Sequence, residues 1–185
     1  MPDSAEAPRI LTIGHSNLLA ESLVEQLAAQ QVRGVADVRR FAASRRWPQF
    51  NAGALAATLD VAGMAYRHFP ALGGRRPPRP DSPNTGWKNT GFRGYADYMQ
   101  TAAFGAALAE LEAWARERLT AIMCAEALYW RCHRRLLADA LLARGWHVEH
   151  ILGPDAPRPA EQTRFARIEA GGIVYPGSAR LFPES

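Results

Sequence analysis

The residues best suited to chemistry lie between positions 119 and 150, in the segment LTAIMCAEALYWRCHRRLLADALLARGWHVEH. A short apolar run leads to Cys124 and Glu126, and a helix with a strongly cationic first turn follows. The N-terminus of a helix already carries partial positive charge and free N–H groups, so further cations there are unfavourable unless an anion binds. The segment therefore predicts an anion site on this turn. Its cationic and thiol side chains are Arg131, Cys132, His133, Arg134 and Arg135.

Two carboxylates are candidates for acid or base catalysis. Glu126 follows the apolar run and could activate water, or it could pair with Arg131 or Arg134 and hold the turn. Asp37 and Arg39 stand two residues apart at the end of another expected strand, so they share one face of it. They could be a second catalytic carboxylate and a bidentate anion clamp, or only a structural ion pair. The residues leave both interpretations open.

Cys132 is a candidate nucleophile, because a helix N-terminus among arginines lowers the pKa of a thiol. The stretch from Cys124 to Arg131 resembles a phosphatase loop, but its spacing is C-x6-R rather than C-x5-R and it contains no glycine. Free cysteines are more often small buried hydrophobic residues. The cysteines also lack the close pairing of a structural zinc site, and the chain has neither a GxGxxG motif nor a Walker loop. We therefore expect neither a metal nor a cofactor.

Two polar segments combine cations with aromatic rings. One is residues 75–94, RRPPRPDSPNTGWKNTGFRG, and the other contains Arg45, Arg46, Trp47 and Phe50. This combination suits phosphate contacts together with base stacking, so a nucleic acid or a nucleotide-like ligand is a possible partner. The alternative is a solvated loop whose aromatic rings pack on the core.

These residues must be positioned by a regular fold. Short apolar runs predict five strands, at 9–14, 32–38, 64–69, 119–124 and 147–152. Helical periodicity predicts helices at 18–30, 52–62, 95–117 and 132–144, with Gly145 as a left-handed C-terminal residue. The alternation predicts a single Rossmann-like three-layer α/β domain, with a mostly parallel five-stranded sheet and helices on both faces. We expect the domain to span residues 9–152, with a linker and a hairpin at 164–176, turning at Gly171-Gly172, packed on it in residues 153–185.

Ligands of open α/β sheets bind outside the carboxyl ends of the strands, and every expected strand ends in polar or titratable residues. We therefore expect these ends to form one pocket, with Glu126 and Asp37 as its catalytic residues. The expected substrate- or anion-binding residues are His15, Ser16, Arg39, Arg45, Tyr66, Arg93, Tyr95, Cys132, His133 and Arg134.

Eight short stretches together form a recognisable set of motifs. They are Thr12 to Ser16, Asp37 to Arg39, Ser44-Arg45, Phe50-Asn51, Leu72 to Gly74, Gly91 to Tyr95, Cys124 to Glu126 and Cys132 to Arg134. With these motifs the chain resembles the family called domain of unknown function 488, from about Ile10 to Ile151. The resemblance implies a small α/β domain and no settled activity, and it suggests a link to the processing of modified nucleobases in DNA.

Charge and targeting signals constrain the partners. The net charge of +4 and a pI near 9.5 suit a nucleic-acid partner, but all basic residues except Lys88 are arginines, as a GC-rich coding sequence also produces. The chain shows no signal peptide and no apolar run of membrane-spanning length, so we expect no membrane association. Two cysteines make no disulfide scaffold, which predicts a reducing cytoplasm. The oligomeric state stays open.

The favoured interpretation is a metal-independent hydrolase acting on a phosphate-bearing substrate, and most concretely a DNA glycosylase for a modified base. Arg39, Arg45 and Arg134 would hold phosphate, and Tyr66 or Trp47 would stack on an extruded base. Glu126 or Asp37 would activate water as the glycosidic bond breaks. Two alternatives remain: a non-catalytic module that binds an anion, a nucleotide or nucleic acid, and a cysteine-dependent enzyme for sulfur or phosphoryl transfer.

Overall fold

The computed structural model describes residues 7–170 and 172–177. Its main sheet has six strands in the order β3-β2-β4-β1-β5-β6, and the first five run parallel. The five predicted parallel strands are confirmed. The sixth was not predicted, because two residues containing a proline give no apolar run. The strands are β1 (Arg9–Gly14), β2 (Gly34–Asp37), β3 (Ala65–His68), β4 (Thr120–Cys124), β5 (His147–His150) and the antiparallel β6 (Arg158–Pro159).

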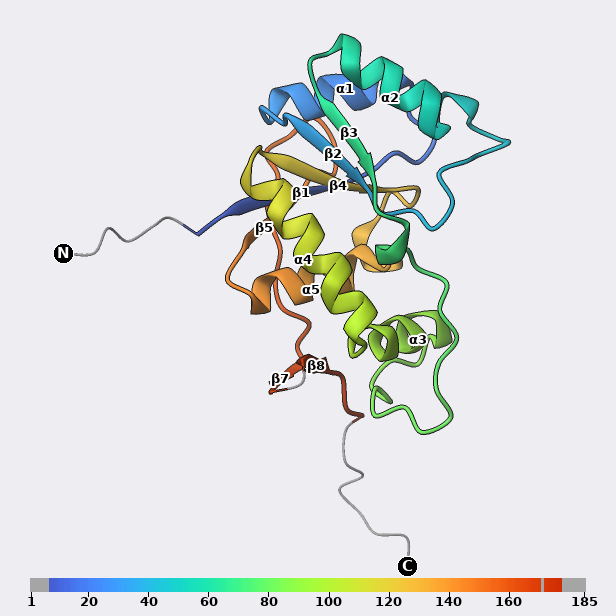
Figure 1. Cartoon of the computed structure of the whole chain (residues 1–185), viewed down its shortest axis with the longest axis vertical. Coiled ribbons are helices and arrows are strands. Elements are labelled where there is room, and N and C mark those ends of the chain that lie inside the picture. Colours follow the sequence, from blue (N-terminus) through green and yellow to red (C-terminus); the bar gives the residue numbers. More distant parts are fainter. Residues whose placement is uncertain (1–6, 171, 178–185) are drawn as a thin grey trace, which may run out of the picture.

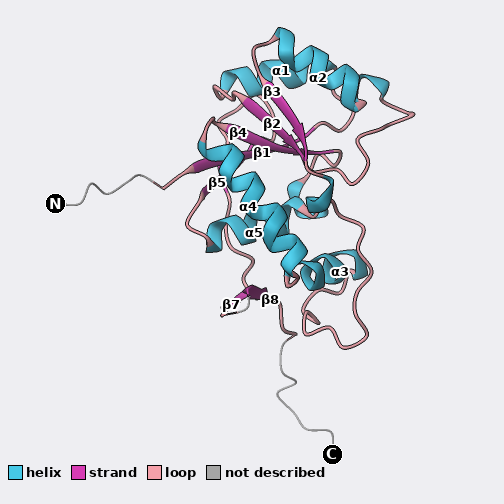
Figure 2. Ribbon diagram, in the orientation of Figure 1, coloured by secondary structure: helices cyan, strands magenta, loops and turns pink. Residues whose placement is uncertain are grey.

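Helices cover both faces of this sheet, which confirms the three-layer arrangement (Figure 1). α1 (Ala20–Ala29) and α2 (Ala52–Val61) pack on one face. On the other face lie α4 (Ala102–Arg116) and α5 (Arg134–Ala143), and α3 (Thr90–Met99) packs against these two helices, farther from the main sheet, as Figure 2 shows. The longest of these, α4, has 15 residues. Within the described ranges, we find no helix with the length and apolar character that crossing a bilayer requires.

Alternation along the strands divides the core between the two faces. Leu11 and Ile13 belong to the cluster under α1 and α2, whereas Ile10 belongs to the cluster under α4 and α5. In β4, Met123 points to the first cluster and Cys124 to the second. Both faces of the central strands are thus buried, as their nearly continuous apolar sequences predict.

Three helix boundaries differ from the sequence prediction. α3 begins at Thr90, within the expected polar segment 75–94, because the Asn89 side chain caps it by accepting a hydrogen bond from the Phe92 N–H (3.1 Å). The single helix expected at 95–117 is two helices, because Thr101 caps a new one by accepting a hydrogen bond from the Phe104 N–H (3.2 Å). The helix expected from Cys132 begins at Arg134, because a 3-10 turn at Tyr129–Arg131 ends in an extended Cys132 (φ −131°, ψ 152°). Gly145 has the predicted left-handed conformation, with φ at 82°.

The C-terminal segment forms the predicted hairpin, β7 (Arg167–Glu169) paired with β8 (Gly172–Val174). Gly171 of the predicted turn lies outside the described residues. After β8, the buried Tyr175 donates a hydrogen bond from its hydroxyl to the Asp139 carboxylate on α5 (2.8 Å). The same carboxylate accepts the Thr163 N–H (2.9 Å), so α5 anchors this segment at two points.

Candidate active site

A pocket of about 1030 Å³ opens at the carboxyl ends of β1, β2 and β4. Three of the expected strand ends meet there, whereas the ends of β3 and β5 do not reach its wall. The β1 end contributes His15 and Ser16, the β2 end contributes Arg39 and Arg40, and the β4 end contributes Cys124, Ala125 and Glu126. Cys132 and His133, just before α5, complete this side.

The pocket wall is strongly cationic. Five arginines line it and Glu126 is the one carboxylate among the described lining residues. Such an imbalance in a concave, partly desolvated space concentrates positive potential and attracts anions. The exposed Phe41 and the half-buried Trp47 and Phe92 add aromatic surface at the same wall. The arginines are Arg39, Arg40, Arg46, Arg75 and Arg131.

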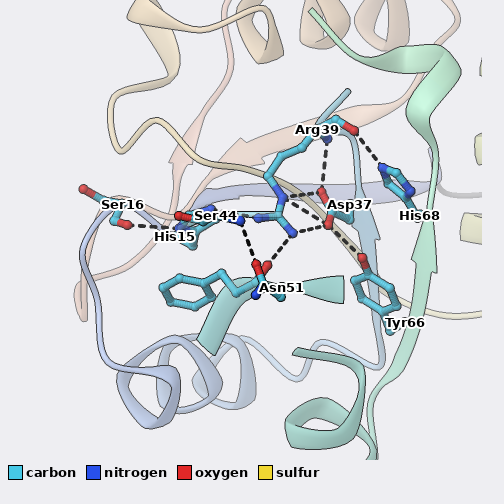
Figure 3. A network of polar contacts seen from close by, with 9 residues as sticks. His15, Ser16, Asp37, Arg39, Ser44, Asn51, Tyr66 and His68 are labelled. Carbon is cyan, nitrogen blue, oxygen red and sulfur yellow. Dashed lines mark hydrogen bonds and ion pairs between the residues drawn. The ribbon is translucent and has the colours of Figure 1, made fainter. Parts of the chain in front are cut away.

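Asp37 is fully buried and already satisfied (Figure 3). Arg39 donates to it through Nε (2.8 Å), through Nη2 (2.5 Å) and through its backbone N–H (3.1 Å). The Tyr66 hydroxyl donates a further hydrogen bond at 2.8 Å. Burial and the Asp37 charge raise the pKa of Tyr66, so the phenol stays a donor. Both carboxylate oxygens of Asp37 are therefore committed to neighbours, and Asp37 does not line the pocket.

His15 joins this closed cluster to the pocket. Its Nδ1 lies 3.0 Å from the Ser16 carbonyl oxygen and its Nε2 lies 3.3 Å from Arg39 Nη1. Since the carbonyl can only accept and the guanidinium can only donate, Nδ1 carries the proton and the ring is neutral. Burial, and then the Arg39 charge, lower the pKa of His15 to about 4. The ring stacks on Phe50 at 4.1 Å between centroids.

The two cysteines form the second cluster. The Sγ atoms of Cys124 and Cys132 lie 2.8 Å apart on the pocket floor, and both residues are buried. The Cys124 hydrogen bond, then His133 and Arg134, hold the pKa of Cys132 well below that of an ordinary thiol, against the effect of burial. Burial, followed by the contact with Cys132, raises the pKa of Cys124 well above the ordinary value. Both shifts favour a thiolate at Cys132 over a thiolate at Cys124, with Cys124 as the hydrogen-bond donor of the pair.

His133 is placed to receive the proton of Cys132. Its Nδ1 lies 3.4 Å from Cys132 Sγ, and its Nε2 donates to the Val38 carbonyl oxygen at 3.1 Å. Because the carbonyl oxygen can only accept, Nε2 carries a proton, and Nδ1 is the ring atom that takes the proton when Cys132 gives it up. A nucleophile, a base and a third group that orients the base are the elements of cysteine nucleophilic catalysis.

Arg134 lies beneath the pocket rather than in its wall. The side chain is 1% exposed, and its Nη2 donates to the carbonyl oxygens of Glu126 and Ala127. Its Nη1 lies 3.4 Å from Thr12 Oγ1, and Nε has no hydrogen-bond partner. In the part of the chain that the structure describes, no carboxylate pairs with Arg134. Its hydrogen bonds thus hold the turn after β4, and its positive charge lowers the pKa of Cys132.

Close contacts with neighbouring atoms explain why two positions of the family motifs, 14 and 74, are glycine. A Cβ on Gly74 would lie 2.9 Å from His133 Nδ1, so this position leaves room for the imidazole. A Cβ on Gly14 would collide with the Glu126 carbonyl oxygen that Arg134 binds. Two non-glycine residues of the pocket wall are also left-handed, Ser16 (φ 46°) and Arg75 (φ 60°). Such conformations cost free energy and concentrate at functional sites.

Half of the site residues expected from the sequence line the pocket. Arg45 is exposed outside the wall, Arg93 donates to the Trp87 carbonyl oxygen, and the buried Tyr95 donates to the Leu72 carbonyl oxygen. The residues in the wall are His15, Ser16, Arg39, Glu126, Cys132 and His133, and those outside it are Asp37, Arg45, Tyr66, Arg93, Tyr95 and Arg134.

Sequence reasoning missed the contact between Cys124 and Cys132 and the contribution of Arg75. The spacing of Cys124 suits neither a phosphatase loop nor a structural zinc site, and Arg75 is one basic residue of a long loop. The Gly73-Gly74 pair just before Arg75 was a usable signal for a close backbone approach. Within residues 7–170 and 172–177, no three His, Cys, Asp or Glu side chains are grouped as metal ligands.

Comparison with known proteins gives a family but no activity. The family model described as "Domain of unknown function DUF488" matches residues 19–141, which is more than half of the chain. The matched range contains the β2 end, the cysteine pair and His133. No curated protein and no solved structure matches the chain. The chain therefore belongs to the family of domain of unknown function 488.

Proposed function

We propose that this protein is an enzyme that uses Cys132 as a nucleophile on an anionic substrate, in sulfur or phosphoryl transfer. The observation that carries the proposal is the Cys132–His133–Val38 arrangement on the floor of an arginine-lined pocket. The arginines supply the electrostatic term that binds an oxyanion and stabilises charge in the transition state. A reducing compartment such as the cytoplasm, the location we favour, would keep both thiols available.

Alkylation tests the nucleophile directly. Iodoacetamide at pH 6 is expected to modify Cys132 faster than an ordinary thiol, because a lowered pKa leaves a larger fraction of it as thiolate, and inorganic phosphate is expected to slow the reaction. Peptide mapping assigns the modified residue. Arg131→Gln should weaken the protection by phosphate, whereas Arg33→Gln, an exposed arginine before β2, should not. A Cys132 that reacts no faster than an ordinary thiol contradicts the proposal.

A second candidate is the hydrolase, in its most concrete form a DNA glycosylase for a modified base. Glu126 supports it, because it is an exposed carboxylate in the pocket wall and could activate water. Trp47 and Phe41 offer stacking surface for an extruded base, and the arginines would hold the flanking phosphates. Tyr66 and Asp37 contribute only by fixing Arg39.

Incubation with duplexes that carry different modified bases, followed by detection of abasic sites, tests this second candidate. Glu126→Gln should abolish product and Cys132→Ser should retain it. Abasic product that depends on Cys132 but not on Glu126 would overturn the carboxylate mechanism. Thermal stabilisation by phosphate or by DNA, with no turnover in either assay, would instead identify a binding module.

A further inference from the structure

The nucleophile has a second thiol in direct contact, and the proposed transfer reaction does not by itself explain that thiol. Cys124 stands 2.8 Å from Cys132 Sγ, at the end of β4, and it is neutral. A hydroxyl or a backbone N–H could donate the same hydrogen bond. What a thiol adds is the capacity to attack sulfur and to form a disulfide.

The position of Cys124 selects between classes of covalent intermediate. A phosphorylated cysteine is discharged by attack at phosphorus, whereas Cys124 contacts Cys132 at its Sγ atom. A sulfur atom carried on Cys132 is discharged by attack at Cys132 Sγ itself, where Cys124 already stands. The geometry thus favours a substrate that delivers sulfur rather than phosphorus.

The cationic pocket wall indicates that the substrate also carries an oxyanion. Arg40 and Arg131 line the same pocket as the cysteines, and arginine binds tetrahedral oxyanions through its planar array of donors. A substrate that joins a transferable sulfur to such an oxyanion uses both features at once. The oxyanion would leave as a dianion into a cationic wall, which lowers the barrier to its departure.

We propose that the pocket takes thiosulfate, an anionic sulfane-sulfur donor, and that Cys124 discharges the sulfur that Cys132 accepts. This inference rests on the proposed role of Cys132 as the nucleophile. It goes beyond that role because it names the substrate class and gives Cys124 a chemical step.

With thiosulfate as the substrate, the reaction takes two steps on the protein and one reduction. The Cys132 thiolate attacks the outer sulfur, the S–S bond breaks, and sulfite leaves with the bonding electron pair, so that Cys132 carries a persulfide. Cys124 then attacks Cys132 Sγ, the Cys124–Cys132 disulfide forms, and hydrosulfide leaves with the proton of Cys124. An external dithiol, the reductant that the cycle requires, is oxidised to its disulfide and restores both thiols.

A single turnover with fully reduced full-length protein, thiosulfate and no added thiol tests the inference. The wild-type protein should release sulfite and hydrosulfide and end as the Cys124–Cys132 disulfide, identified by intact mass and peptide mapping. Cys124→Ser should release sulfite, retain the persulfide on Cys132 and release no hydrosulfide. Cys132→Ser should release neither product. Circular dichroism of each variant verifies that it folds.

Two different failures are distinguishable. If Cys132 alkylates rapidly at pH 6 with protection by phosphate, but thiosulfate releases no sulfite, the substrate class is wrong and the proposed nucleophile stands. If Cys132 is unreactive toward both reagents, both proposals fall. Hydrosulfide release that continues in Cys124→Ser overturns the role of Cys124.

Discussion

The Asp37–Arg39 pair and the Cys124–Cys132 pair begin at the carboxyl ends of the neighbouring strands β2 and β4, yet their charges are balanced in opposite ways. The carboxylate meets a guanidinium, a phenol and a backbone N–H, all inside the protein. Cys132 contacts the Cys124 thiol and His133. The nearby buried Arg134 donates to carbonyl oxygens and pairs with no described carboxylate. A closed cluster stabilises the fold around the pocket, whereas an incompletely balanced one can react with a ligand. Their separation predicts that stability and reactivity respond to different substitutions.

The largest expected effect on stability is that of Asp37→Asn. The substitution leaves the Arg39 guanidinium, 6% exposed, without a counter-charge, and breaking a buried ion pair in this way costs about 3–5 kcal/mol. Urea denaturation measures the free energy of unfolding. The rate at which iodoacetamide modifies Cys132 should stay near the wild-type rate while the variant is folded. A variant of wild-type stability that loses catalysis would show instead that Asp37 is a catalytic residue.

Two buried histidines, His15 next to the closed cluster and His150 at the end of β5, should make the protein sensitive to acid. Burial lowers the pKa of both to about 4, with a further contribution from Arg39 at His15 and from Arg134 at His150, whereas both titrate near 6.5 in the unfolded chain. As the pH falls, these histidines therefore bind protons in the unfolded state at a higher pH than in the folded state. The stability that these residues contribute is complete above about pH 6.5 and declines as the pH falls toward 4, by roughly 2–3 kcal/mol for each histidine.

Urea denaturation at a series of pH values between 7 and 4 measures this decline. His15→Gln keeps hydrogen-bonding capacity and does not titrate, so its free energy of unfolding should fall less steeply over the same range. Equal slopes for the variant and the wild type would show that His15 does not stay neutral in the fold.

The strands that carry the two pairs could be predicted from the sequence, whereas the contacts that balance the charge of each pair could not. Apolar runs fixed the five parallel strands, and β1 was predicted with its exact bounds. The register that pairs Val35 with Tyr66 places the phenol diagonally beside Asp37, but a register across two strands is not visible in the sequence. The contact between Cys124 and Cys132 depends on the 3-10 turn between them and on Arg134 binding two carbonyl oxygens, which is a tertiary effect.

Loss of the base should affect reactivity far more than stability. His133→Gln removes the imidazole that accepts the Cys132 proton, and an amide keeps hydrogen bonding to the Val38 carbonyl oxygen. The pKa of Cys132 should rise toward that of an ordinary thiol. The rate of iodoacetamide modification at pH 6 should then fall by about tenfold or more, since one unit of pKa is a factor of ten in thiolate. An unchanged pH profile would assign the low pKa to Cys124 and Arg134 alone.

The smallest expected effect is that of Tyr66→Phe, and it tests how completely the two clusters are separated. The substitution removes one hydrogen bond to Asp37, whose three contacts with Arg39 remain. A hydrogen bond to a charged group contributes about 1.5–3 kcal/mol, and the remaining donors should keep the loss near the lower limit. Neither the alkylation rate of Cys132 nor its protection by phosphate should change, because Tyr66 does not reach the pocket wall. If the phosphate protection weakens, then the closed cluster does set the position of Arg39 for the ligand, and the two pairs form one site.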